Sequence, residues 1–366
     1  MRRAPHLVVH WKGDALIVRN YATDRAIRVN PLICVLLDYC TSWRSIDEIA
    51  DALGSTGLPA TRRLVTRLVT VTLLERSDRA PDPRVRAMSA LDPWNPEAGF
   101  FHSATRDVQF WSPATARRKA RIQADLVPMP VPVKRHRAKA VPLPQPSLDN
   151  AFAQVLLRRR TWRRYSASPV TAGELATLLA LSVGVQHWAR TAAGEVPLKT
   201  SPSGGARHPI ECYVVVRQVR GIRSGVYHYA AGDHVLERIR GPVPPVRMRA
   251  YVPSSGYFAR ASAMVFFTAV FERQLWRYPY SRAYRAALIE AGHVCQTFLL
   301  TATAIGLAPY CVMGLADSLI EEDLGLDGIT ESVMYCAGVG RPPRGTDWAP
   351  LTRGTLEARP NPTFTR

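Results

Sequence analysis

The chain has 366 residues, of which 47% are hydrophobic, and a formal net charge of +19. This length exceeds the roughly 150 residues of an average domain, so we expect one large domain and one small one. No apolar run approaches the roughly 20 residues of a membrane span, and the N-terminus lacks the uninterrupted apolar stretch of a signal peptide. We therefore expect a soluble, cytoplasmic protein without a membrane partner.

The positive charge and the cysteines indicate which ligands and metal sites to expect. The charge comes almost wholly from arginine, and it permits binding of nucleic acid, an acidic peptide or an anionic cofactor. Of these we expect no nucleic-acid partner. The six cysteines are scattered, without a C-x-x-C pair or a spacing that suits zinc. The sequence therefore predicts free thiols and no metal site.

Residues 1–80 predict a small winged-helix-like domain. The stretch "HLVVHWKGDALIVRNY" contains two strand-like runs around a Lys-Gly-Asp turn. A helix follows in "SIDEIADAL", where Ser45 and Glu48 form a capping box, and "ATRRLVTRLVTVTLLER" continues with helical spacing. Arg62, Arg63 and Arg67 on this last helix either contact phosphates or form a solvated face.

Residues 81–150 differ sharply in composition from the rest of the chain. They hold 11 of the 29 prolines and the basic cluster "VKRHRAK". Proline removes backbone donors and breaks regular elements, so this region is predicted to be a linker or an arm that lies over the surface. A nucleic-acid-binding tail is the alternative that the basic cluster leaves open.

Residues 151–366 predict an α+β domain. Helices are expected in "AFAQVLLRRR", in "TAGELATLLALSVGV" with a capping box of Thr171 and Glu174, and in a long stretch that ends near Gly306. Strands are expected in "ECYVVVRQV", "GVYHYAAGDHVLERI", "SAMVFFTAVF" and "SVMYCAGVG". The mixture of period-2 and period-3.6 patterns in one stretch of about 200 residues is typical of a single large domain.

Two segments of this domain suggest contact with a ligand. In "TSPSGGARHP" the two adjacent glycines let the backbone approach a neighbour closely, either a ligand or the core strand that follows. In "LRRRTWRRYS", arginines and a hydroxyl lie just after a predicted helix, where they could converge on a phosphate. A solvated basic helix end is the other interpretation of the second segment.

The order of these features resembles the FMN-dependent nitroreductase superfamily, and within it the SagB/McbC-type azoline dehydrogenases of ribosomal peptide biosynthesis. The resemblance is carried by "RRTWRRY", "PSGGARHPIECYVVV", "GVYHY", "RYPYSRAYRAALIEAGHVCQTFLLTATAIGL" and "GVGRP". It implies a nitroreductase-like FMN fold, in which a central, mainly antiparallel sheet is flanked by helices. It also implies a homodimer with flavin sites between two protomers, an N-terminal domain that recognises a leader peptide, and partnership with other biosynthetic enzymes.

The resemblance also implies which residues bind FMN. They would come from four segments, namely Arg159, Arg160, Thr161 and Arg163; Pro202, Ser203, Gly204 and Gly205; Met313, Gly314 and Leu315; and Arg341 and Arg344. In the first segment Arg160 is the least certain match. The last two arginines could instead be surface charges.

The catalytic residues implied by the resemblance are Arg277 and Tyr278. Such dehydrogenases commonly have a Lys-Tyr pair shortly before the long helix, where this chain has Arg-Tyr. The reaction takes a proton from Cα while a hydride leaves Cβ for flavin N5. Arginine cannot accept the proton at ordinary pH, so Tyr278 is the predicted base and Arg277 the cation that favours its phenolate.

Other residues could act as the base in place of Tyr278. Tyr280 and Tyr284 are alternative bases, whereas His208, His228 and His293 are predicted to be structural. The expected function is an FMN-dependent dehydrogenase that oxidises a thiazoline, an oxazoline or a related C–N unit in a modified peptide. An NAD(P)H-dependent nitro or quinone reductase and a catalytically silent peptide-docking protein remain as alternatives.

Overall fold

The computed structural model describes residues 1–54, 57–127, 130, 143–191 and 194–345. The basic cluster "VKRHRAK" and residues 346–366 lie outside the described residues. We refer to residues 1–80 as the N-terminal unit, to residues 81–150 as the arm and to residues 151–345 as the C-terminal unit. Among the described residues, no helix combines the length and the apolar character that crossing a lipid bilayer requires.

The N-terminal unit contains a three-stranded antiparallel sheet and three helices. The strands are β2 (Leu7–Lys12), β3 (Ala15–Asn20) and β4 (Arg25–Val29), and the helices are α1 (Pro31–Tyr39), α2 (Ile46–Ala52) and α3 (Leu58–Thr70). The two short strands β1 (Arg2–Arg3) and β5 (Leu74–Glu75) also pair with each other. The expected hairpin and the capping box of Ser45 and Glu48 are both confirmed. The sequence missed the third strand.

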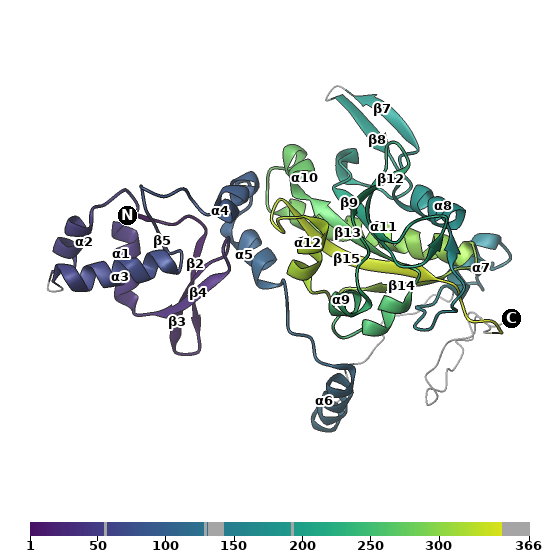
Figure 1. The fold of residues 1–366 in the computed structure, drawn as a ribbon, viewed down its shortest axis with the longest axis horizontal. Helices are drawn as coiled ribbons and strands as arrows, with labels where there is room; N and C mark the ends of the chain where they lie inside the picture. Colours follow the sequence, from purple (N-terminus) through teal and green to yellow (C-terminus); the bar gives the residue numbers. More distant parts are fainter. Residues whose placement is uncertain (55–56, 128–129, 131–142, 192–193, 346–366) are drawn as a thin grey trace.

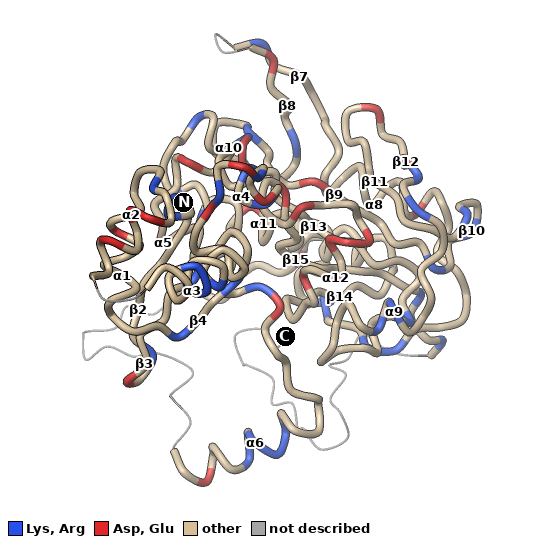
Figure 2. The backbone as a smooth tube through the Cα atoms, turned by 60° about the vertical axis from the view of Figure 1, so that its left-hand side comes forward, with Lys and Arg blue, Asp and Glu red and all other residues tan. Residues whose placement is uncertain are grey.

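The predicted helix over residues 60–76 was wrong in its last turns. Helix α3 stops at Thr70, Thr72 has a φ of +57°, and Leu74 pairs with Arg3 in a strand. A β-branched residue in the left-handed region cannot continue a right-handed helix, so the chain turns there. Arg62, Arg63 and Arg67 are exposed on the outer face of α3, where Figure 2 shows basic residues.

The arm contains more regular structure than its prolines suggested. Its helices are α4 (Pro83–Met88), the 3₁₀ turn η1 (Ser89–Leu91), α5 (Pro96–Ala104) and α6 (Pro113–Leu126). Each of the three α-helices has its proline at the first position, where the missing N–H has no helical partner. Helix α6 buries none of its residues and carries basic side chains (Figure 2).

A six-stranded antiparallel sheet forms the centre of the C-terminal unit, as the family resemblance implied. Its strand order is β12-β11-β9-β13-β15-β14, and every pairing within it is antiparallel. The strands are β9 (Ile210–Val216), β11 (Gly225–Ala230), β12 (Val235–Arg240), β13 (Ala263–Val270), β14 (Ala308–Val312) and β15 (Glu331–Gly340).

Helices cover both faces of this sheet (Figure 1). Helices α7 (Ala151–Arg158), α8 (Ala172–Val183) and α11 (Arg282–Ala304) lie on one side, and α9 (Pro245–Ala250), η3 (Gly256–Arg260) and α12 (Asp317–Leu324) on the other. Successive residues of a strand face opposite ways, so Val265 and Phe267 of β13 pack with α8 and α11, whereas Met264 and Phe266 pack with α9 and α12.

The remaining elements connect the sheet to its surroundings. They are the parallel pair β6 (Val170–Thr171) and β10 (Val219–Arg220), the hairpin β7 (His187–Thr191) and β8 (Gly194–Leu198), the 3₁₀ turn η2 (Gly204–Ala206) and helix α10 (Phe271–Arg277). The sequence did not predict the hairpin or α10. The Thr171 and Glu174 capping box and the long helix, with Gly306 at a φ of +76° after its end, are confirmed.

Candidate functional site

The Gly-Gly loop lies against the predicted catalytic pair. Gly205 has a φ of +61°, and a Cβ placed on it would lie 3.1 Å from the Tyr278 hydroxyl and 3.6 Å from Arg277 Cγ. A Cβ on Gly204 would lie 3.5 Å from the Tyr278 ring. The glycines therefore let the backbone approach the side chains of Arg277 and Tyr278 closely. The sequence analysis had expected a ligand or the following strand as the neighbour of the glycines.

Helix α10 and the turn after it hold Tyr278 in place. The Tyr278 N–H closes α10 by donating to the Gln274 carbonyl at 2.8 Å, and the Tyr278 carbonyl accepts from the Tyr280 N–H at 2.7 Å. Tyr278 is half-buried, while Arg277 and Tyr280 are exposed. The backbone of Tyr278 is thus fixed on both sides, and its ring remains accessible beside the glycines.

A buried carboxyl group that the sequence analysis missed fixes the other side of the loop. Glu290 of α11 is only 5% exposed, and its Oε1 accepts from the Gly204 N–H at 3.0 Å and from Gln274 Nε2 at 2.5 Å. Burial raises the pKa of Glu290 above its ordinary value, against the opposing effect of these hydrogen bonds. The only signal in the sequence was one acidic residue within the apolar stretch "AALIEAGH".

The structure gives Tyr284, one of the two alternative bases, a packing role. Tyr284 is buried against Trp94 and Phe271, with its hydroxyl 3.2 Å from His102 Nδ1, and burial raises its pKa to about 12. This side chain therefore packs the arm onto α11. Among the predicted structural histidines, His228 lies between two carboxylates, His208 is buried and His293 is exposed.

The basic segment after α7 forms a second cluster, beside β14. The Trp162 N–H donates to the Pro309 carbonyl at 2.9 Å, which fixes the segment to the start of that strand. Arg159 is half-buried. The hydrogen bond with the Cys295 thiol lowers the pKa of the Cys311 thiol, and the Tyr335 hydroxyl and the charge of Arg159 act in the same direction. Thr161 is half-buried and Arg163 is exposed. Arg160 instead donates to two carbonyls of its own segment.

The other predicted FMN ligands differ in what they can offer. Met313 is 76% exposed just after β14, and a Cβ on Gly314 would lie 3.2 Å from Ser254 Oγ, whereas the Leu315 side chain is buried in the core. Arg341 forms a double contact with Glu174 at 2.9 and 2.7 Å and also donates to a carbonyl. It therefore holds the start of α8, while Arg344 is exposed.

The predicted site residues fall into two groups within one chain. Pro202 and Ser203 belong to the Gly-Gly loop, and the Ser203 hydroxyl accepts from the His208 N–H at 2.8 Å. This loop lies at the end of α10, whereas the basic segment follows α7, and Figure 1 shows α10 and α7 on opposite sides of the C-terminal unit. No three His, Cys, Asp or Glu side chains of the described residues gather as metal ligands would.

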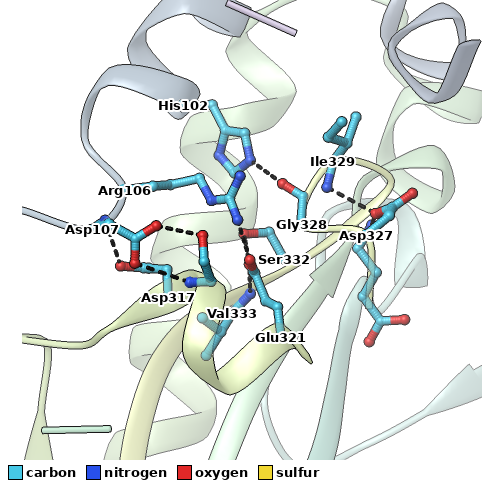
Figure 3. Close-up of polar contacts among 12 residues, drawn as sticks. His102, Arg106, Asp107, Asp317, Glu321, Asp327, Gly328, Ile329, Ser332 and Val333 are labelled. Carbon is cyan, nitrogen blue, oxygen red and sulfur yellow. Dashed lines mark hydrogen bonds and ion pairs between the residues drawn. The ribbon is translucent and has the colours of Figure 1, made fainter. Parts of the chain in front are cut away.

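The arm is attached to the C-terminal unit close to helix α10, which precedes Tyr278. His102 donates through Nε2 to the Gly328 carbonyl at 3.0 Å, Arg106 pairs with the buried Glu321, and Asp107 binds the start of α12 (Figure 3). Trp94 packs edge-on against Phe271, the first residue of α10, with ring centroids 4.9 Å apart. Residues 83–107 of the arm thus pack against the C-terminal unit, and they support helix α10, which ends just before Tyr278.

Comparison with known proteins identifies the family. Residues 156–341, half of the chain, match the nitroreductase family. The chain belongs to the nitroreductase family. The putative nitroreductase MJ1384 of Methanocaldococcus jannaschii is 35% identical to this nitroreductase over 187 residues, which cover 51% of the chain and 89% of MJ1384. The expectation drawn from the quoted motifs is therefore confirmed at the level of the family.

Other relatives of this nitroreductase are named for peptide processing. The trifolitoxin-processing protein TfxB of Rhizobium leguminosarum is 37% identical over 156 residues, 41% of each chain. The microcin B17-processing protein McbC of Escherichia coli is 31% identical over 135 residues, 34% of this chain and 48% of McbC. The chain thus spans less than half the length of these two relatives.

One solved structure supports the fold beyond the family match. The Escherichia coli microcin synthetase McbBCD complex with truncated pro-MccB17 bound contains a chain that is 18% identical, with a TM-score of 0.50. The match covers 73% of this nitroreductase and all of that chain, so it extends beyond residues 156–341. A fold shared at this length is consistent with an N-terminal unit placed ahead of the nitroreductase sheet.

Proposed function

We propose that this member of the nitroreductase family is an FMN-dependent dehydrogenase that oxidises an azoline or a related C–N unit in a modified peptide. The observation that carries the proposal is the Gly204–Gly205 loop lying against Tyr278 and Arg277, with no side chain between the loop and the phenol. The names of TfxB and McbC as processing proteins support a peptide substrate, and the McbBCD complex with truncated pro-MccB17 bound supports partnership with other biosynthetic enzymes.

The residues present fit a bound FMN. Exposed or half-buried cations and a hydroxyl occur together at Arg159, Thr161 and Arg163, which suits a phosphate, and Met313 and Gly314 follow β14 with little side-chain cover. Glycines 204 and 205 let the loop approach the Tyr278 phenol more closely than a residue with a Cβ could, so the loop and the predicted base lie together. We assign the phosphate to Arg159 and Arg163 ahead of Arg160 and Arg341, because the latter two already donate within the chain.

A homodimer would bring the two groups of residues together. In one chain the Gly-Gly loop and the basic segment are apart, so we propose that each flavin site takes one group from each protomer. Exposed apolar residues offer the surface, namely Phe152 and Leu156 of α7, Leu181 of α8, and Leu288 and Ile289 of α11. Helix α11 packs against both α7 and α8, so these side chains belong to adjoining helices.

In the proposed reaction Tyr278 takes the proton from the substrate Cα. FMN, when bound, supplies the acceptor for the hydride from Cβ. Arg277 stabilises the negative charge on the phenolate oxygen, a role that an arginine performs without itself losing a proton. Glu290 holds the Gly204 N–H, and thereby keeps the loop at a fixed distance from the phenol.

The cofactor is tested on the purified protein. We expect one non-covalent FMN per protomer, released by heat and identified by chromatography. Arg163→Ala removes a charge-assisted hydrogen bond worth about 1.5–3 kcal/mol, so FMN should bind roughly 10- to 150-fold more weakly. Arg62→Ala on the exposed face of α3 is the control and should bind FMN normally. Unchanged affinity in Arg163→Ala, or FAD in place of FMN, contradicts the assignment.

The base is tested by Tyr278→Phe, which keeps the ring and removes only the hydroxyl. Turnover of an azoline peptide, followed by its two-dalton mass loss with oxygen as acceptor, should fall by about 10²- to 10⁴-fold while FMN stays bound. Tyr280→Phe is the matched control, since Tyr280 is exposed two residues away, and it should turn over normally. A flavin-loaded Tyr278→Phe protein with normal turnover would show that another group is the base.

The similarity to MJ1384, which is named a putative nitroreductase, favours a second function. Under this alternative the protein reduces nitro or quinone compounds with NAD(P)H. Rapid bleaching of the bound flavin by NADPH, without oxidation of an azoline peptide, would select it over the proposed dehydrogenase.

A further inference from the structure

A cavity of about 610 Å³ lies beside the Gly-Gly loop, and we call it the Lys199 cavity. Its walls come from the β7–β8 hairpin, from residues 206–208 directly after the glycines, and from α10. The side chains that matter below are Lys199, Arg207, Glu211, Arg273, Trp188 and Trp276. Tyr278 and the predicted FMN ligands are not among the lining residues, so this space is separate from the site described above.

Lys199 lies at the base of the cavity without an ion pair among the described residues. Glu211 pairs with Arg273 at 2.5 Å and with His228 Nε2 at 2.8 Å, and the other ring nitrogen of His228 pairs with Glu237 at 2.8 Å. Its hydrogen bonds with these carboxylates raise the pKa of His228 to about 9, so it is charged at neutral pH. Glu331 also interacts electrostatically with Glu211 and Arg273. Lys199 is a further cation beside a carboxylate that is already bonded twice.

The neighbouring His208 lies close to several of these cations. Its pKa is lowered to about 4, first by burial and then by the charges of Lys199, Arg273 and Arg207. Burial and Arg273 also lower the pKa of Lys199, while Glu211 raises it. The other two carboxylates of the lining, on Glu195 and Glu272, are exposed and screened by solvent. An anion within the cavity would meet an ammonium group that forms no ion pair among the described residues.

The upper walls of the cavity are aromatic. Trp188 is 55% exposed and Trp276 is 61% exposed, although both are large apolar side chains, and the Arg207 guanidinium lies 5.0 Å from the Trp276 ring. Binding sites typically combine apolar walls with a few well-placed polar groups. This cavity therefore suits a ligand that joins a carboxylate to an apolar side chain.

We propose that the Lys199 cavity binds a carboxylate of a peptide through Lys199, with a neighbouring apolar side chain between Trp188 and Trp276. As a substrate site it rests on the proposed function, because residues 206–208 line the cavity and follow the glycines that lie against Tyr278. A peptide held here would extend along the same loop toward the phenol. The cavity would then select modified peptides with an acidic residue near the ring that is oxidised.

Binding is measured without turnover, on the full chain labelled with 5-fluorotryptophan. Of the eight tryptophans, the ¹⁹F signals of Trp188 and Trp276 are assigned with Trp188→Phe and Trp276→Phe. The probes are acetyl-Phe-Glu-amide, its Gln counterpart and sodium acetate. We expect the Glu peptide to shift these two signals and to bind about fivefold more tightly than the Gln peptide, since a charge-assisted hydrogen bond is about twice as strong as a neutral one.

Variants separate the ammonium group from general effects on folding. Lys199→Gln should bind the Glu and Gln peptides equally, and Lys199→Arg should keep a preference for Glu. Lys12→Gln, which removes the same charge from an exposed position in β2, should keep the full preference. Equal binding of the two peptides by the wild-type protein, or shifts at other tryptophans, overturns the proposal. Saturation by acetate alone overturns the peptide as the ligand.

This readout distinguishes the two proposals. Selective binding without azoline oxidation would refute the proposed function and leave the carboxylate site in place. Azoline oxidation by a protein that binds both peptides equally would refute the carboxylate site alone.

Discussion

Gly205→Ala tests the contact on which the proposed function rests. Alanine in the left-handed region costs about 1–2 kcal/mol, and Gly205 lies there with a φ of +61°. At roughly 2–4 °C per kcal/mol for a domain of this size, Tm should fall by about 2–8 °C. The new Cβ would also lie 3.1 Å from the Tyr278 hydroxyl, so the phenol has to move by a few tenths of an ångström.

A second glycine separates the strain from the contact. Gly306 after α11 has a φ of +76°, and no atom lies within 4 Å of the position of its Cβ. Gly306→Ala should therefore lose similar stability while keeping its turnover of an azoline peptide. Gly205→Ala should lose roughly tenfold or more in turnover, since a misplaced catalytic group is costly. Equal turnover in the two variants, measured below the Tm of both, would refute the assignment of this contact.

Two further predictions concern pH and assembly. Because the pKa of His228 is raised to about 9 from 6.5, its stabilising effect is fully present below pH 6.5 and is lost as the pH rises through 9. After solvent screening of this partly exposed group, urea unfolding should show wild type losing about 1–2 kcal/mol more than His228→Gln between pH 6 and 9, and parallel losses would contradict this. Ile289→Glu on α11 should yield a monomer with weakened FMN binding by light scattering and flavin titration. Val246→Glu, at a position of α9 that is also exposed, should stay dimeric. A wild-type monomer that retains flavin would refute the shared site.

The local patterns of the sequence predicted much of the C-terminal unit. The capping box at Thr171 and Glu174, five of the six strands of the sheet and the long helix follow from residues close together in the chain, whereas strand β14 was not predicted. Prolines in the arm were interpreted as breakers, although Pro83, Pro96 and Pro113 each start a helix. A proline at the first helical position and one in a linker look alike until the residues after it find something to pack on.

The parts of the candidate site that were missed depend on contacts between distant residues. Glu290 meets Gly204 across 86 positions of the chain, and Arg341 meets Glu174 across 167. Neither pair has a spacing that a helix or strand period would reveal. Arg341 was visible in the sequence as a cation after the last strand. Its partner Glu174 was already assigned to the capping box of α8, so nothing in the sequence indicated a second contact.

The docking of the arm defines where this chain can be divided. Helix α10 has seven residues, too few to persist without external packing, and Trp94 supplies part of that packing at its first residue. A chimera that exchanges the N-terminal unit should therefore be joined just before Pro83, with residues 83–107 kept from the same parent as the sheet. The composition of the proline-rich segment that follows would also suggest a junction there. That junction would replace residues 83–107, which pack against the helix before Tyr278, although every candidate catalytic residue would stay in the protein.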